Sequence, residues 1–176
     1  MKYHLEIVLQ ISLELCEIYK NADKDLVEAI VWIHDYAKML DFDYDDEMLM
    51  TEGYKALKIV GFEENFIKKV MEYTRVLEKK MEVDLNTAPI EVKIVSSADG
   101  ASHLVGPFYY LWWYENPEKP YEELMEDNRR KADKDWKRKI VLPEVKKVFK
   151  QRHRFQLEQS GDIPSIFLSR RRKSEC

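Results

Sequence analysis

Residues 29–38 read Ala-Ile-Val-Trp-Ile-His-Asp-Tyr-Ala-Lys, and this stretch decides both the expected fold and the expected chemistry. Four apolar residues precede the pair His34-Asp35, near the end of a predicted helix. Both polar side chains are costly to bury without partners. A divalent metal ion removes that cost, because neutral imidazole and ionised carboxylate are good ligands for such ions. Adjacent helix positions splay by about 100°, so the pair can hold one ion only near the helix end, with other helices completing the shell.

The chain around this stretch reads as one helix after another. Apolar side chains recur at helical spacing over residues 5–19, 26–34, 47–60, 63–82 and 89–102, and a basic helix with an apolar stripe follows at 129–154. Asp23 is suited to begin the second helix, and Gly61 to end the third. No segment shows the alternating pattern of a strand. We therefore expect an all-α bundle of roughly six to eight helices.

Two further residues are able to complete a metal shell around the pair. His4 lies at the start of the first predicted helix, and Asp99 lies on a core-like face with Val95, Ala98 and Ser102. Taken alone, each has a simpler interpretation, because a lone histidine is more often structural or exposed and a lone helical aspartate more often faces water.

The pattern of His4, His34-Asp35 and Asp99 on a chain of helices resembles the HD-domain superfamily of metal-dependent phosphohydrolases. The resemblance covers about residues 1–155 and includes the segment Ile-Val-Ser-Ser-Ala-Asp-Gly at 94–100. It implies an HD-type helical bundle with His4, His34, Asp35 and Asp99 as ligands of one divalent ion, which is manganese, cobalt, nickel, iron, zinc or magnesium. The sequence has no histidine between Asp35 and Asp99, so it resembles the single-metal, nucleotidase-like branch. That branch places a glutamate where this chain has Lys38.

The implied activity is hydrolysis of a nucleotide or another small phosphate ester, with a metal-activated water as nucleophile. Asp35 is expected to bind the ion and orient the water, and Lys38 to contact the phosphate. Lys38 is equally well explained as a lysine that ends a helix. Asp43, in the acidic loop that follows, is a further candidate for general acid or base. His103, one turn after Asp99, is a candidate ligand, a supporting residue or a phosphate contact, and a structural histidine is the simpler interpretation.

Composition favours a single domain outside a membrane. The chain has 176 residues, of which 45% are hydrophobic, so it can bury a core without disulfides or structural metal ions. We expect the domain to span 1–159 and a mobile tail to span 160–176. The two cysteines form no disulfide framework, which suits the cytoplasm. The longest run without Asp, Glu, Lys or Arg is 100–114, shorter than the roughly 18 residues of a membrane span.

The distribution of charge leaves an alternative open. Residues 1–127 carry 13 basic and 27 acidic side chains, whereas residues 128–154 carry 12 and 3. The alternative to an enzyme is a degenerate HD module with a structural metal that binds a nucleotide, nucleic acid or protein partner. Nucleic acid is the less favoured partner, because a basic run such as 170–173 is usually just solvated.

The aromatic run at 108–114 cannot face one core entirely. A homodimer interface would cover those of its side chains that are exposed.

Overall fold

The computed structural model describes residues 2–41, 43, 45–79 and 82–162. Its helices are α1 (Lys2–Ile18), α2 (Lys24–Ile33), α3 (Tyr36–Leu40), α4 (Asp46–Val60), α5 (Glu64–Glu78), α6 (Ile90–Ser102), α7 (Phe108–Glu115), α8 (Tyr121–Lys134) and α9 (Pro143–Gln159). A short 3₁₀ turn, η1 (Leu85–Thr87), precedes α6, and a π-helical turn, η2 (Asp135–Lys139), extends α8. No strand occurs among the described residues, so the predicted all-α class is confirmed.

The helix boundaries follow from residues that were visible in the sequence. The Asp23 carboxylate accepts a hydrogen bond from the Leu26 N–H at 3.1 Å and so caps the first turn of α2. Gly61 ends α4 in the left-handed conformation, with φ of 96°, where a side chain would be strained. Helix α2 ends at Ile33, and α3 begins at Tyr36. His34 and Asp35 therefore lie at a break between two helices, which frees both side chains to point away from a regular helical face.

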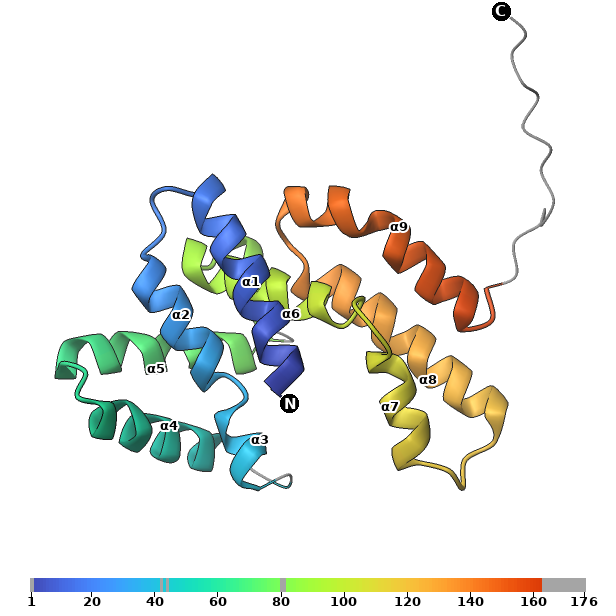
Figure 1. Ribbon diagram of the computed structural model, residues 1–176, viewed down its shortest axis with the longest axis horizontal. Helices are drawn as coiled ribbons and strands as arrows, with labels where there is room; N and C mark the ends of the chain where they lie inside the picture. The colour runs from blue at the N-terminus through green and yellow to red at the C-terminus, as the bar shows by residue number, and fades with distance from the viewer. Residues whose placement is uncertain (1, 42, 44, 80–81, 163–176) are drawn as a thin grey trace, which may run out of the picture.

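Helix α6 is the centre of the molecule. Helix α1 crosses it, α2, α4 and α5 lie toward one side, and α7, α8 and α9 lie toward the other (Figure 1). Of residues 91–102 in α6, all but Lys93 are buried. The helix can be enclosed in this way because its second half is built from small residues: Ser96, Ser97, Ala98, Gly100, Ala101 and Ser102.

Small side chains let η2 and the segment after it approach α6 closely. The Ser96 hydroxyl donates to the Lys139 carbonyl at 3.0 Å, and the Ser97 hydroxyl accepts from the Val141 N–H at 3.1 Å. A Cβ atom at Gly100 would lie 2.9 Å from both Lys139 Cβ and Ile140 Cγ1. The backbone of α6 at Gly100 is thus packed directly against the start of the C-terminal helices.

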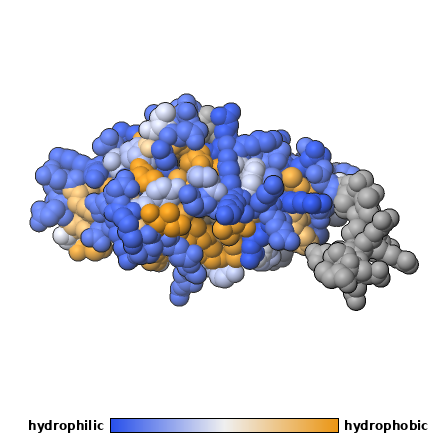
Figure 2. Space-filling model, turned by 90° about the horizontal axis from the view of Figure 1, so that it is seen from above, coloured by the Kyte–Doolittle hydropathy of each residue, from blue (hydrophilic) through white to orange (hydrophobic). Residues whose placement is uncertain are grey.

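The surface carries apolar side chains as well as charge. Trp112 and Tyr114 of α7 are 41% and 86% exposed, as expected for an aromatic run that cannot face one core. Figure 2 shows other apolar side chains gathered near the middle of the face seen from above. None of the described helices is both long enough and apolar enough to cross a bilayer. Of the predicted tail, residues 160–162 are described, with Ser160 buried, and residues 163–176 lie outside the described part of the chain.

We expect Gly100→Ala to lower the free energy of unfolding by about 1 kcal/mol or more. Overpacking of a filled core costs roughly 1–3 kcal/mol, which exceeds the gain in helix propensity of up to about 1 kcal/mol. Urea denaturation followed by circular dichroism measures the change. Gly53→Ala in α4 is the matched control, because its added methyl meets the flexible end of Met71 and the side chain of Ile33 at 3.1 Å. A Gly100→Ala protein as stable as the parent would contradict this account of the packing.

Candidate metal centre

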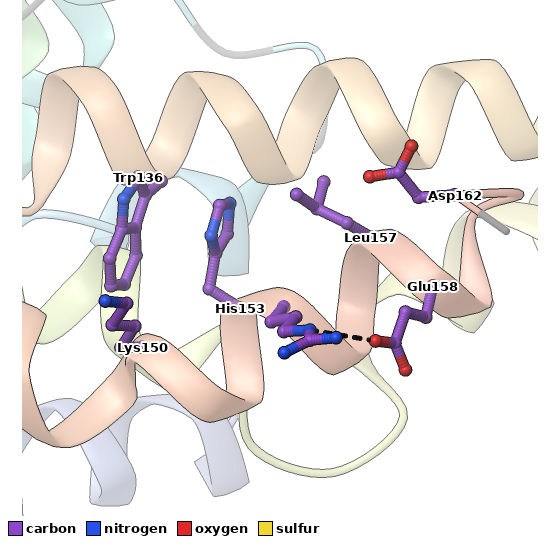
Figure 3. A pocket seen from close by; sticks show the side chains of 7 residues that line it. Trp136, Lys150, His153, Leu157, Glu158 and Asp162 are labelled. Atoms are coloured by element: carbon purple, nitrogen blue, oxygen red, sulfur yellow. Dashed lines mark hydrogen bonds and ion pairs between the residues drawn. The ribbon is translucent and has the colours of Figure 1, made fainter. Parts of the chain in front are cut away.

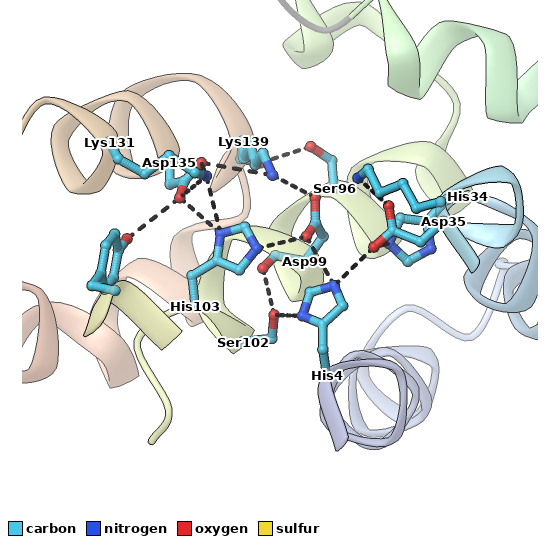
Figure 4. A network of polar contacts seen from close by, with 12 residues as sticks. His4, His34, Asp35, Ser96, Asp99, Ser102, His103, Lys131, Asp135 and Lys139 are labelled. Carbon is cyan, nitrogen blue, oxygen red and sulfur yellow. Dashed lines mark hydrogen bonds and ion pairs between the residues drawn. The ribbon is translucent and has the colours of Figure 1, made fainter. Parts of the chain in front are cut away.

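Three helix ends bring a group of histidines and aspartates together (Figure 4). His4 comes from the first turn of α1, and His34 and Asp35 come from the break after α2. Asp99 and His103 come from the last turn of α6 and the residue that follows it. The four aspartate and histidine residues from α2 and α6 are at least 93% buried, and the side chain of His4 is 11% exposed.

The ring orientation of His4 follows from its hydrogen bonds. Its Nδ1 atom lies 3.0 Å from the Ser102 hydroxyl, which itself donates to the Asp99 carbonyl at 2.7 Å. Because the hydroxyl proton is already used, Nδ1 of His4 must be the donor. The Nε2 atom then carries a lone pair, and it points toward Asp35 Oδ2 at 3.4 Å and Asp99 Oδ1 at 3.6 Å.

His34 is arranged in the same way. Its Nδ1 donates to the Val31 carbonyl at 2.7 Å, which leaves a lone pair on Nε2. That Nε2 atom is buried and has no hydrogen-bond partner among the described residues. It lies 3.6 Å from Asp35 Oδ2. A buried acceptor without a partner is costly, and a cation at this position would satisfy it.

Each of the two carboxylates is shared between a lysine and the histidines. Asp35 binds Lys38 through Oδ1 and faces His4 and His34 through Oδ2. Asp99 binds Lys139 through Oδ2 at 2.7 Å and faces His4 through Oδ1. One oxygen of each carboxylate is therefore fixed by an ammonium group, and the other is directed at the imidazole nitrogens.

Charge around Asp35 keeps its carboxylate ionised. Burial by itself raises the pKa of Asp35, whereas the Lys38 ammonium bound to Oδ1 lowers it and favours the ionised form. Lys139 is the opposite case. Burial lowers its pKa, yet Asp99 and Asp135 together raise it above the ordinary value, so Lys139 stays charged.

These residues fit a divalent ion. The ligand atoms of His4, His34 and Asp35 all lie within 4.8 Å of one another, and so do those of His4, Asp99 and His103. Neighbouring ligands with bonds of about 2.1 Å lie roughly 3 Å apart, close to the separations of 3.3–3.6 Å between these nitrogens and oxygens. In addition, two of the three histidines donate Nδ1–H to a neutral protein oxygen, as metal-bound histidines usually do.

The sequence also proposed Lys38, Asp43 and His103 as functional residues, and the structure places each of them differently relative to this cluster. Lys38 reaches it by binding Asp35, with its side chain 35% exposed. Asp43 lies in the loop after α3, where it is exposed and its N–H donates to Asp41 Oδ1. His103 joins the cluster, with its Nε2 3.3 Å from Asp99 Oδ1.

Sequence reasoning missed Asp135 and Lys139 altogether. Both lie in the π-helical turn η2, inside a segment in which nearly every second residue is charged. Asp135 accepts from His103 Nδ1 at 2.8 Å and from Lys131 at 2.7 Å, while Lys139 binds Asp99. Nothing in the local pattern separates them from their exposed neighbours. The i, i+4 spacing of Asp99 and His103, in contrast, was visible in the sequence.

The comparison with protein families gives a single result. The HD domain model matches residues 1–103, which is more than half of the chain. The chain belongs to the HD-domain family. This match confirms the predicted resemblance, and it includes the four residues that were expected to bind metal. No curated protein and no solved structure gives a significant match to the chain.

The HD match ends at His103, so η2, α8 and α9 lie outside it. A groove of about 340 Å³ lies within this C-terminal part, where Trp136 and His153 are stacked with their ring centroids 4.3 Å apart (Figure 3). Lys150 and Arg154 also line it, and Arg154 is paired with Glu158 at 3.0 Å. None of its lining residues belongs to the histidine–aspartate cluster, so it is a separate surface feature.

We expect Lys139→Met to lower the free energy of unfolding of the metal-free protein by about 3 kcal/mol or more. Removal of one partner from a buried ion pair leaves the other charge uncompensated, at a cost of roughly 3–5 kcal/mol. Urea denaturation in the presence of a chelator measures the change. Lys137→Met, in the same turn, is the control, because Lys137 is exposed and pairs with Asp133 at the surface. Equal losses for the two variants would show that the Lys139–Asp99 pair does not stabilise the fold.

Proposed function

We propose that this HD-domain protein is a metal-dependent phosphohydrolase that acts on a nucleotide or another small phosphate ester. HD domains are in general hydrolytic phosphohydrolases that bind divalent metals, which supports the proposal. The observation that carries it is the buried Nε2 of His34, which has no hydrogen-bond partner in the described structure and faces Asp35. In this proposal His4, His34, Asp35 and Asp99 hold one divalent ion.

The ion would supply a Lewis acid for a phosphate oxygen and lower the pKa of a bound water. The protein itself holds the metal-binding atoms of these side chains in position before the ion binds. Lys38 favours the ionised form of Asp35, and the Nδ1–H groups of His4 and His34 donate to the Ser102 hydroxyl and the Val31 carbonyl. Both Nε2 lone pairs are thereby directed inward before any ligand binds, which reduces the ordering cost of binding.

Lys38 is proposed as the phosphate contact. Its ammonium group lies at the edge of the cluster, where its side chain is 35% exposed, and it belongs to the short helix α3. A phosphate that approaches the exposed side of the cluster would meet this charge before it reaches the buried residues. Asp43 stays a proposal for general acid or base, from the exposed loop that follows α3.

A second candidate function rests on the groove between η2 and α9. The groove combines the aromatic pair with two basic and two acidic side chains, Lys150, Arg154, Glu158 and Asp162, so a polar partner of mixed charge would fit it, which is the binding-module alternative. In that case the metal would be structural and no phosphate ester would be hydrolysed.

Two further predictions from the sequence, a homodimer and a cytoplasmic location, stay predictions.

We expect Asp35→Asn to reduce metal-dependent phosphate release by at least about a hundredfold, because both the activated water and the Lewis acid depend on the site. The assay is a screen of nucleotides and phosphodiesters against each candidate ion, with phosphate release as the readout. Asp46→Asn, at an exposed position in the first turn of α4, is the control and should behave as the parent. Circular dichroism checks that the helical fold survives. Equal turnover by Asp35→Asn and the parent, at equal metal loading, would reject the hydrolase in favour of the binding module.

We expect Lys38→Met to lower kcat/KM by about ten- to a hundredfold while bound metal is retained. A charged hydrogen bond to phosphate is worth about 1.5–3 kcal/mol. Lys55→Met is the matched control, since Lys55 pairs with Glu52 at the same i, i+3 spacing on the surface. Metal content by mass spectrometry separates two causes. Loss of metal together with rate would mean that Lys38 only supports Asp35, and unchanged kinetics would leave it a helix-end lysine.

A further inference from the structure

His103 occupies a position that the four-ligand arrangement does not use. It follows α6 directly, one helical turn after Asp99, and it is 95% buried. Its Nε2 lies 3.3 Å from Asp99 Oδ1, the same oxygen that faces His4 Nε2 at 3.6 Å. His103 and His34 lie on either side of His4, and all three rings turn toward the aspartates (Figure 4).

The other side of the His103 ring is fixed by residues outside the HD match. Nδ1 donates to Asp135 Oδ2 at 2.8 Å, and the ring is stacked on Phe108 with the centroids 3.8 Å apart. Asp135 is itself 99% buried and is held by Lys131 at 2.7 Å and by the Tyr109 hydroxyl at 3.3 Å. The ring therefore cannot turn without breaking several contacts.

This arrangement determines which nitrogen is available. With Nδ1–H donated to a carboxylate, the lone pair is on Nε2, inside the cluster. A carboxylate is one of the common partners for the second nitrogen of a metal-bound histidine, because it fixes the ring and increases its basicity.

We propose that His103 is a fifth protein ligand of the same ion, in addition to His4, His34, Asp35 and Asp99. The inference rests on the proposed metal site, but not on the proposed hydrolysis. The ligand atoms of His4, Asp99 and His103 lie within 4.8 Å of one another, as do those of His4, His34 and Asp35, and His4 belongs to both groups. The five ligand atoms do not form a single group within that distance, so an ion next to His4 Nε2 would draw the two groups together.

The donor set has a consequence for the identity of the ion. Three imidazole nitrogens and two carboxylate oxygens suit manganese, iron, cobalt, nickel or zinc, whereas magnesium prefers oxygen ligands and retained waters. Five protein ligands leave one position of a six-coordinate shell for a water or a substrate oxygen. A transition metal should therefore bind more tightly than magnesium.

The first test is a titration of the metal-free protein with Co²⁺, followed by calorimetry in the absence of any substrate. His103→Asn is the informative variant, because the asparagine amide can still donate to Asp135 but is too short to reach the position of Nε2. We expect one ion per chain in the parent and an affinity at least about tenfold lower in the variant. His153→Asn, which alters a histidine of the C-terminal groove, is the control and should match the parent. Equal affinity for His103→Asn and the parent would overturn the proposal.

The second test does not depend on the stability of any variant. In a crystal structure of the Co²⁺-loaded parent, with the ion located by anomalous scattering, His103 Nε2 should lie within about 2.5 Å of the metal, since such bonds are close to 2 Å. A separation above about 3 Å would show that His103 only positions Asp99. Both tests are made without substrate, so a protein that binds Co²⁺ through His103 but hydrolyses nothing would reject the proposed function and keep this inference.

Discussion

The buried carboxylates Asp35 and Asp99 impose the main constraint on this structure, because each needs positive charge in a place that water barely reaches. Lys38 supplies it for Asp35, and Lys139 supplies it for Asp99. His4 lies between the two, with its Nε2 within 3.6 Å of an oxygen of each. The ends of α1, α2 and α6 must therefore meet at one point, and the packing of the surrounding helices is consistent with that requirement.

The two lysines differ in a way that suits different roles. The Lys38 side chain is 35% exposed and belongs to a short helix, which suits the phosphate contact that we propose for it. The Lys139 side chain is 9% exposed, and its ammonium group is enclosed between Asp99 and Asp135. It has no comparable path to solvent, so we assign it a structural role. Lys139 compensates charge inside the protein, whereas Lys38 does so at the edge of the cluster.

The C-terminal helices supply the support of the site from outside the region that defines the family. Residues 1–103 carry every proposed ligand, yet the groups that hold Asp99 and His103 in place are Lys139 and Asp135. The connection depends on small residues of α6. Gly100 allows η2 to approach, and the hydroxyls of Ser96 and Ser97 satisfy backbone groups of the segment that follows. A larger residue at Gly100 would move Lys139 and Asp99 apart.

The sequence by itself determined the helical class, because apolar side chains recur with the helical period along most of the chain. It also determined local boundaries, such as Asp23 before α2 and Gly61 after α4, where a cap or a left-handed turn depends on one residue. His4, His34, Asp35 and Asp99 were recognisable together, because their pattern resembles that of the HD-domain superfamily, whereas His4 or Asp99 alone has a simpler interpretation. Only the tertiary structure decided that Lys139 and Asp135 support the site. Lys139 is 40 residues from Asp99, and its burial results from a π-helical turn that packs on small side chains of another helix. No local pattern encodes such a contact, because an ion pair between distant segments depends on how the helices pack and not on the residues next to it.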